Sequence, residues 1–385
     1  MPRILIIGEI MSKKDKFKTS LIGMVGGALY GVIIGCCMIE LDDVFIFNSV
    51  VGVLICELLI AVVVYFTATS IHECGHLVMG LATGYKFVML RIGTVTIVKQ
   101  DGKLKYKKFG IPGTGGQCTL TYDEVSDPEK VPYFWYHFGG CFFNFITAAA
   151  AGLCVLFTES GFLYVVMLNL AGISFLDGIL NLIPVNTGVI NDGTNILRLK
   201  KDPKKRAAVL SVLTVNGMQF EGKRLSDIDE KYLDAADENG KSPFCDVALI
   251  KGARYVYLHE FDKARDIHES LVNNPNLPAV LKNEALCELM YCRCMLGCTK
   301  EEIDELYTKE LKYYIRQTEN YMIARRRQMY TYYLFYEGDT EKSKWERMKA
   351  EQMANSYPCR SEYEEEIRMM NYAEELEKNI KNHLT

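Results

Sequence analysis

The sequence predicts a mainly α-helical protein, in which a polytopic membrane part of about four helices with a small β-hairpin is followed by a soluble α-helical repeat domain. Two observations support this fold class. The first half contains apolar runs long enough to cross a bilayer. Charge is concentrated in the second half, because residues 1–200 hold 15 basic and 15 acidic side chains, whereas residues 201–385 hold 29 and 33. We therefore divide the chain into a membrane-embedded domain (1–200) and a polar helical domain (201–385).

Composition argues against two classes of protein. The formal net charge is −4, so the chain lacks the basic surplus of a nucleic-acid-binding protein. The 13 cysteines show no regular spacing, which favours a reducing compartment over a disulfide-stabilised secreted domain. Cys292, Cys294 and Cys298 form a tight cluster with no fourth ligand nearby in the sequence. We interpret them as buried thiols rather than a zinc site.

Two apolar runs begin the membrane part. The run from Leu21 to Ile39 is long enough for one helix across the bilayer. The run from Val44 to about Leu81 is longer than one hydrocarbon core, so its far end is expected to protrude, tilt or line a wet cavity. This second run contains Glu57, which we interpret as a buried polar contact with another span. An acid inside a membrane is also a default candidate for function.

Residues 84–131 interrupt the helical pattern. Phe87–Val98 is rich in β-forming residues, Asp101-Gly102 is typical of a hairpin turn, and Lys103–Phe109 is the expected return strand. The sequence therefore predicts a small sheet at the membrane surface.

Two further apolar runs, Tyr133–Leu156 and Gly161–Ile183, are separated by four residues and predict an antiparallel helical pair. With four spans, the three basic segments near 13–18, 86–108 and 198–206 all lie on one side. Loops with an excess of Lys and Arg face the cytoplasm. We therefore expect an integral protein of the cell membrane whose termini, sheet and C-terminal domain are cytoplasmic.

The polar half predicts helical hairpins, with turns near residues 259, 297 and 338. One segment resembles a tetratricopeptide repeat, in which small and aromatic positions let two helices pack closely; its matching residues are Gly252, Tyr255, Phe261, Ala264, Leu271 and Pro275. A short solenoid with a concave face for a cytosolic peptide or protein partner is expected. A plain helical bundle is the alternative. The runs 325–327 (Arg) and 364–366 (Glu) are interpreted as solvated helix faces.

The chemistry of the chain is concentrated in His72-Glu73-Cys74-Gly75-His76, an H-E-x-x-H motif near the end of the second apolar run. Histidines four residues apart on a helix share one face and can bind one Zn²⁺, and Glu73 can accept a proton from the water that the metal polarises. Such polar groups are costly at the end of a span unless paired or metal-bound. A solvated helix end is the alternative. Tetrahedral zinc needs a third protein ligand; the candidates are Asp192, Asp177, Glu57 and His137.

Three ordered elements of the membrane half resemble the site-2 protease family of intramembrane zinc metalloproteases. They are the motif at 72–76, the segment Gly139-Gly140-Cys141-Phe142-Phe143-Asn144, and Asn181-Leu182-Ile183-Pro184 followed by Asp192-Gly193. The resemblance implies that His72, His76 and Asp192 bind zinc. It also implies that Asn144 and Asn181 lie beside the catalytic water or the substrate carbonyl.

The spacing from Pro184 to Asp192 is longer than in many members of that family, and Leu176-Asp177-Gly178 lies upstream. Asp177 is 15 residues before Asp192, roughly 22 Å if the chain were helical, so we favour Asp192 as the ligand. Pro184, Gly188 and Gly193 are expected to unwind the chain and to let Asp192 turn back to the metal. His137 is interpreted as an interfacial histidine or as a partner near the site.

The resemblance implies an intramembrane zinc endopeptidase that hydrolyses transmembrane or membrane-associated substrates in regulated intramembrane proteolysis. Glu73 would carry the proton from water to the leaving amine. The surface sheet or the loop 113–116 would clamp an unwound substrate as an added strand; a purely structural hairpin is the alternative. Two other functions remain open: a membrane zincin with a cytosolic site and a Glu as third ligand, and a non-catalytic scaffold or sensor with a structural metal site.

Overall fold

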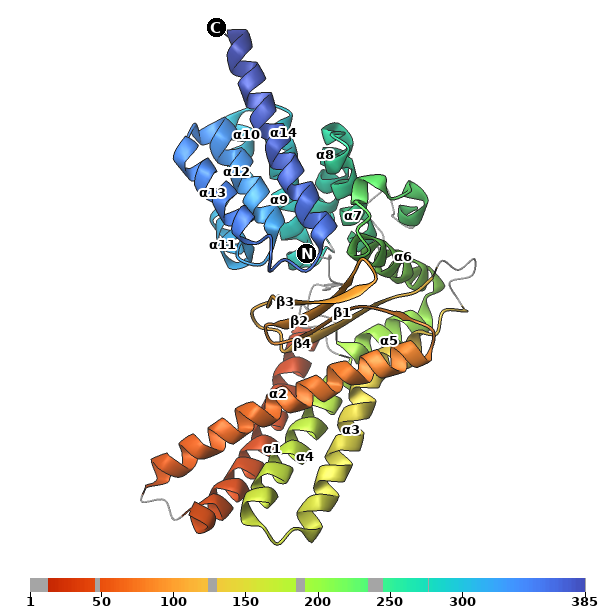
Figure 1. Ribbon diagram of the computed structural model, residues 1–385, viewed down its shortest axis with the longest axis vertical. Helices are drawn as coiled ribbons and strands as arrows, with labels where there is room; N and C mark the ends of the chain where they lie inside the picture. The colour runs from red at the N-terminus through yellow and green to blue at the C-terminus, as the bar shows by residue number, and fades with distance from the viewer. Residues whose placement is uncertain are drawn as a thin grey trace.

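The structure is a computed structural model, and it describes residues 13–45, 49–123, 130–184, 191–234, 245–275 and 277–384. Three layers follow one another along the long axis of the molecule (Figure 1). Four long apolar helices form one end, a small sheet lies in the middle, and the more polar helices of the second half form the other end.

The four long helices are α1 (Lys13–Phe45), α2 (Val50–Ala82), α3 (Tyr133–Phe157) and α4 (Gly161–Leu182). Each contains a stretch that is long and apolar enough to cross a membrane, which agrees with the predicted number of four. Glu57 of α2 is fully buried, and its carboxylate accepts a hydrogen bond of 3.0 Å from Asn169 of α4. The expected contact of Glu57 with another span is therefore present.

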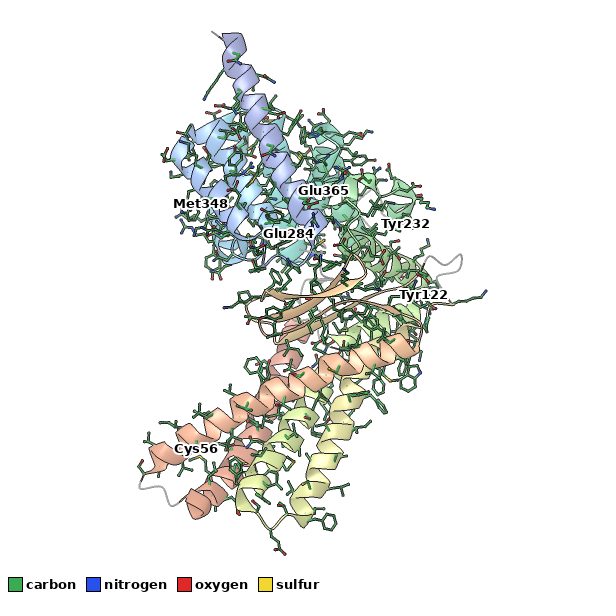
Figure 2. The ribbon with its side chains drawn as sticks, viewed as in Figure 1. Cys56, Tyr122, Tyr232, Glu284, Met348 and Glu365 are labelled. Carbon is green, nitrogen blue, oxygen red and sulfur yellow. The ribbon has the colours of Figure 1, made fainter. Side chains whose placement is uncertain are left out.

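The sheet has four antiparallel strands, β1 (Lys86–Ile92), β2 (Val95–Gln100), β3 (Lys103–Lys108) and β4 (Gly116–Thr121), in the order β3-β2-β1-β4. The predicted turn at Asp101-Gly102 is present, with φ of 52° and 72°. The structure differs from the predicted hairpin in two ways. A turn at Gly93 divides the first predicted strand, and residues 116–121, after the Gly-rich loop, form a fourth strand. Tyr122 lies just beyond β4 (Figure 2). Its ring packs on that of Tyr85, with 4.8 Å between centroids.

The remaining helices are listed in chain order: α5 (Asp192–Lys201), α6 (Pro203–Phe220), the 3-10 turns η2 (Leu225–Asp227) and η3 (Glu230–Leu233), α7 (Cys245–Tyr257), α8 (Phe261–Val272), α9 (Ala279–Met295), α10 (Lys300–Asp304), α11 (Lys309–Thr318), α12 (Ile323–Tyr332), the π-helical η4 (Tyr333–Glu337), α13 (Thr340–Gln352) and α14 (Arg360–Leu384). The predicted turns near 259, 297 and 338 separate helices, and each holds a residue at positive φ: His259, Gly297 and Gly338. We call residues 203–384 the helical segment.

The sheet is packed between the two helical layers. One face lies on α2, where Leu120 of β4 contacts Gly80. On the other face, Met89 and Val98 belong to the same hydrophobic cluster as Ile250 and other residues of the helical segment. The amide of Gln100 also donates a 2.8 Å hydrogen bond to the carbonyl oxygen of Pro358. The sheet and the helical segment therefore share one core.

The expectation of solvated charge runs in the helical segment is wrong for most of these side chains. The three arginines 325–327 are at most 3 % exposed, and each pairs with a glutamate from another helix. Arg327, for example, binds Glu288 of α9 at 2.9 Å and Glu366 of α14. Glu365 is buried and accepts two backbone N–H groups near residue 225, whereas Glu364 is exposed. Figure 2 shows Glu284 and Glu365 within this layer.

Candidate metal centre

The H-E-x-x-H motif lies in the last three turns of α2. This helix begins after Ser49, whose hydroxyl accepts the N–H of Gly52, and it ends before Gly84 with φ of 93°. The side chains of His72, Glu73 and His76 are all at least nine-tenths buried within the protein. Burial of three polar side chains requires partners, and these come from α3, α4, α5 and the loop before β4.

Helix α3 approaches the motif through its glycines. Gly139 meets the backbone of Gly75, so α2 and α3 cross in direct backbone contact. The next residue, Gly140, lies against both imidazole rings. Small residues of this kind let two membrane helices approach closely.

The third candidate ligand, Asp192, comes from the chain that follows α4. Helix α4 ends at Leu182, and α5 begins at Asp192. Gly193 was expected to unwind the chain but is part of α5, and Gly188 lies outside the described residues. Asn191 connects the two helices, because its amide donates to the carbonyl oxygens of Leu180 (2.9 Å) and Ile183 (2.7 Å). Its Oδ1 also accepts the N–H of Thr194 and caps α5. These contacts place Asp192 beside the C-terminal end of α2.

The three expected ligands converge. Nε2 of His72 and Nε2 of His76 are 3.0 Å apart, and Oδ2 of Asp192 lies 3.2 Å from the first and 3.4 Å from the second. Two ligand atoms bound to a tetrahedral zinc at 2.0–2.1 Å are about 3.3 Å apart. Two imidazole nitrogens and one carboxylate oxygen also form a common ligand set for catalytic zinc. The residues present therefore fit a zinc ion.

The charge state of Asp192 suits a ligand. Burial opposes its ionisation, but the neighbouring His76 and His72 more than offset burial, and the pKa of Asp192 lies well below its ordinary value. The carboxylate is 15 % exposed. It is thus ionised at neutral pH and available as an oxygen donor.

The outer nitrogens of the two rings have different partners. Nδ1 of His76 lies 2.8 Å from the backbone carbonyl oxygen of Tyr136. Nδ1 of His72 faces Nδ2 of Asn144 at 3.1 Å and Oδ2 of Asp177 at 3.5 Å. The large separation expected between Asp177 and the site is therefore wrong. Helix α4 crosses α2 so that Asp177 lies beside Nδ1 of His72. The chain after α4 then turns back and places Asp192 beside Nε2 of the same ring.

The two predicted asparagines both contact Asp177. Asn144 is fully buried, and its Nδ2 donates to Oδ2 of Asp177 at 2.6 Å. Asn181 donates to Oδ1 of Asp177 at 3.0 Å and to its carbonyl oxygen at 3.1 Å. Asn144 therefore lies beside His72, whereas the amide nitrogen of Asn181 is engaged within its own helix.

Glu73 lies against the loop that precedes β4. A β-carbon on Gly116 would be 2.5 Å from Cγ of Glu73, so backbone and carboxylate are in direct contact. Arg91 of β1 holds this loop: its guanidinium donates to Oγ1 of Thr114 at 2.7 Å and to the carbonyl oxygen of Gly116 at 3.2 Å. Sequence reasoning did not place Arg91 at the site; the available signal was a cation between two apolar neighbours, Leu90 and Ile92.

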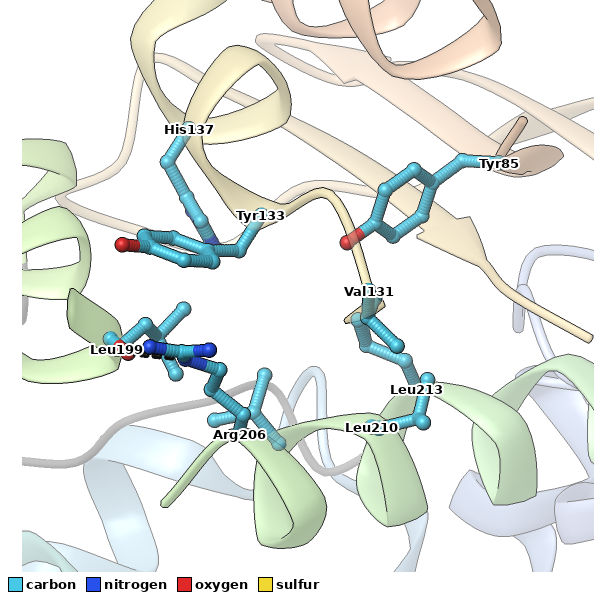
Figure 3. Close-up of a pocket in the computed structure, with 9 residues that line it drawn as sticks. Tyr85, Val131, Tyr133, His137, Leu199, Arg206, Leu210 and Leu213 are labelled. Carbon is cyan, nitrogen blue, oxygen red and sulfur yellow. Dashed lines mark hydrogen bonds between the residues drawn. The ribbon is translucent and has the colours of Figure 1, made fainter. Parts of the chain in front are cut away.

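His137 does not join the three ligands. It points into a small cavity of about 10 Å³ between α3, α5 and α6, where Tyr133 and Arg206 face it (Figure 3). A cavity of this size is at the lower limit of what holds one water molecule. Among the described residues, the one group of three or more possible metal ligands is His72, His76 and Asp192.

Comparisons with protein-family models, with curated proteins and with solved structures found no match.

Proposed function

We propose that the chain is an intramembrane zinc endopeptidase that cuts transmembrane or membrane-associated proteins, with α1–α4 in the bilayer and the sheet and helical segment in the cytoplasm. The observation that supports this proposal best is the set of 3.0–3.4 Å distances among the donor atoms of His72, His76 and Asp192. Their position at the sheet end of apolar helices favours a substrate within the membrane.

His72, His76 and Asp192 would hold the ion. Zinc there would supply a Lewis acid that polarises a water molecule and the substrate carbonyl. Glu73 adjoins the ligands on α2 and would take a proton from water and return it to the leaving amine. Oδ1 of Asn144 is buried without a hydrogen-bond partner among the described residues, so it is available to accept a hydrogen bond and fix the orientation of a water molecule.

A helical substrate must unwind before its amide bonds can be attacked, because a helix occupies its own backbone groups. The strand nearest Glu73 is β4, an edge strand of the sheet. The hydroxyl of Tyr136 donates to the carbonyl oxygen of Cys118 at 3.1 Å, so part of the outer edge is already engaged. An extended substrate would pair along the outer edge of β4.

The helical segment would recruit a cytosolic peptide or protein, or gate access to the site. Support comes from the tight hairpin of α7 and α8, in which Gly252 packs directly against the ring of His268. Such hairpins are the unit from which helical repeat proteins build a binding face.

Metal content and proteolysis together test the function. We expect one zinc per chain in the purified wild type and in Glu73→Gln, and none in Asp192→Ala, measured by mass spectrometry of metal content. Glu57→Gln is the matched control, since it changes a buried acid of the same helix away from the cluster. Membranes of cells with Glu73→Gln should accumulate an uncut membrane protein relative to wild type. A folded wild type without zinc overturns the proposal, and zinc without any accumulating substrate favours a scaffold.

A further inference from the structure

The outer nitrogen of His72 has a carboxylate within reach, whereas that of His76 has a backbone carbonyl. Asp177 comes from α4 and lies 3.5 Å from Nδ1 of His72. His72 itself is 6 % exposed, so this nitrogen is shielded from bulk water. The pair lies on the side of the ring opposite Asp192.

The hydrogen-bond chemistry of the ring selects Asp177 as the acceptor. When Nε2 of a neutral imidazole binds a metal, the proton is on Nδ1, which must donate. Nδ2 of Asn144 also donates, and its 2.6 Å contact with Asp177 fixes it as the amide nitrogen, because an oxygen there would face a carboxylate oxygen. Asn144 therefore cannot accept the proton of His72, and Oδ2 of Asp177 can.

Asp177 is itself held in place from two helices. Asn144 of α3 donates to one carboxylate oxygen, and Asn181 of α4 donates to the other at 3.0 Å. These two contacts leave the carboxylate little rotational freedom. A fixed acceptor on one side of His72 and the metal position on the other would define both the tautomer and the plane of the ring.

We infer that Asp177 is a positioning residue of the metal centre, which orients His72 through its Nδ1 proton while Asp192 serves as the ligand. The inference rests on the proposed zinc site. Metal-bound histidines generally donate their second N–H to such a partner, and loss of the partner costs 10–100-fold in metal affinity. Asp177→Asn should therefore lower zinc affinity by about 10–100-fold without removing a ligand.

The experiment is a zinc competition titration against a chromophoric chelator at one fixed pH, with the full chain in detergent. Wild type, Asp177→Asn, Asp177→Glu and Glu57→Gln are compared, and Asp192→Ala marks the loss of a ligand. Glu57→Gln is the matched control, because the Glu57 carboxylate is likewise held by an asparagine from a neighbouring helix, and this variant should bind zinc as the wild type does. The absorption spectrum of the cobalt-loaded protein provides a second readout, in which Asp177→Asn should shift the bands and Asp192→Ala should abolish them.

A purely structural role for Asp177 makes a different prediction: the zinc-free Asp177→Asn protein would melt at a lower temperature, with zinc affinity and cobalt spectrum unchanged. Zinc affinity within twofold of wild type in Asp177→Asn overturns the inference and leaves the proposed function intact. Absence of zinc binding in the wild type overturns both. If Asp177→Asn fails to fold, Asp177→Glu decides, because it retains the charge but displaces the carboxylate oxygens. A zinc affinity below that of Glu57→Gln then supports the positioning role of Asp177. A zinc affinity equal to that of Glu57→Gln overturns it.

Discussion

Gly140 of α3 lies so close to His72 that a β-carbon at this position would be 2.5 Å from Nε2 of the ring. The same β-carbon would be 2.6 Å from Nε2 of His76. Those are the two nitrogens that face Asp192. The backbone of α3 therefore forms one wall of the candidate metal centre, and that wall has no room for a side chain.

Gly140→Ala should weaken zinc binding by displacing both imidazoles. Gly152→Ala is the matched control on the same helix, since a β-carbon there meets nothing within 4 Å. Zinc per chain, measured after dialysis against a weak chelator, should fall in Gly140→Ala and stay at the wild-type value in Gly152→Ala. Equal zinc in the two variants would contradict the described geometry.

Gly116→Ala should separate proton transfer from metal binding. The added methyl group would lie 2.5 Å from Cγ and 2.6 Å from Oε1 of Glu73, so it displaces the carboxylate without touching the ligands. We expect zinc content as in wild type and slower cleavage of whichever membrane protein accumulates with Glu73→Gln. Loss of zinc instead would show that the loop before β4 supports the ligands themselves.

Asp246, in the first turn of α7, should make stability depend on pH. Burial raises its pKa from 3.8 to about 7, with Arg198 acting in the opposite direction. The folded state therefore favours the neutral carboxyl, and the stabilisation that this group gives is complete below about pH 4 and is lost as pH rises to about 7.

Asp246→Asn imitates the neutral form and should remove that dependence. The apparent melting temperature of the variant should exceed that of the wild type at pH 8, and the difference should shrink toward pH 4. Parallel melting curves across this pH range would show that Asp246 keeps an ordinary pKa in the folded chain.

Arg327→Met should destabilise the helical segment by about 3–5 kcal/mol, because it leaves buried Glu288 and Glu366 without this cation. The guanidinium also lies 3.9 Å from the ring centroid of Tyr291, a contact that methionine does not replace. Urea unfolding followed by the fluorescence of Trp345, with Trp135 changed to Phe, measures the effect.

Arg360→Met is the control for charge removal, since Arg360 pairs with Glu364 on an exposed helix face. Its unfolding midpoint should stay close to that of the parent protein. A small effect of Arg327→Met, similar to this control, would contradict the buried pairing.

The sequence was most informative where the structure is local. The four long helices follow from the length and apolar composition of their sequences. The turns follow from residues that tolerate positive φ, and the shared face of His72 and His76 follows from helical spacing. The strand β4 was missed because only Gly116 of the predicted loop belongs to it, and residues 116–121 are extended through pairing with β1, which lies far away in the sequence.

Contacts between distant elements could not be predicted in this way. The distance from Asp177 to His72 depends on how α4 crosses α2, which no spacing within α4 determines. The burial of Arg327 likewise depends on Glu288 and Glu366, each 39 residues away. A charged run looks the same in sequence whether it faces water or opposite charges.

The core shared by the sheet and the helical segment limits how freely this architecture can be recombined. Met89 and Val98 lie in the same apolar cluster as the helices, while β4 of the same sheet touches Glu73. A chimera that joined the four long helices and the sheet to an unrelated soluble module would expose an apolar sheet face to water. The two halves are therefore expected to have diversified together, with substitutions on one side of the boundary matched by substitutions on the other.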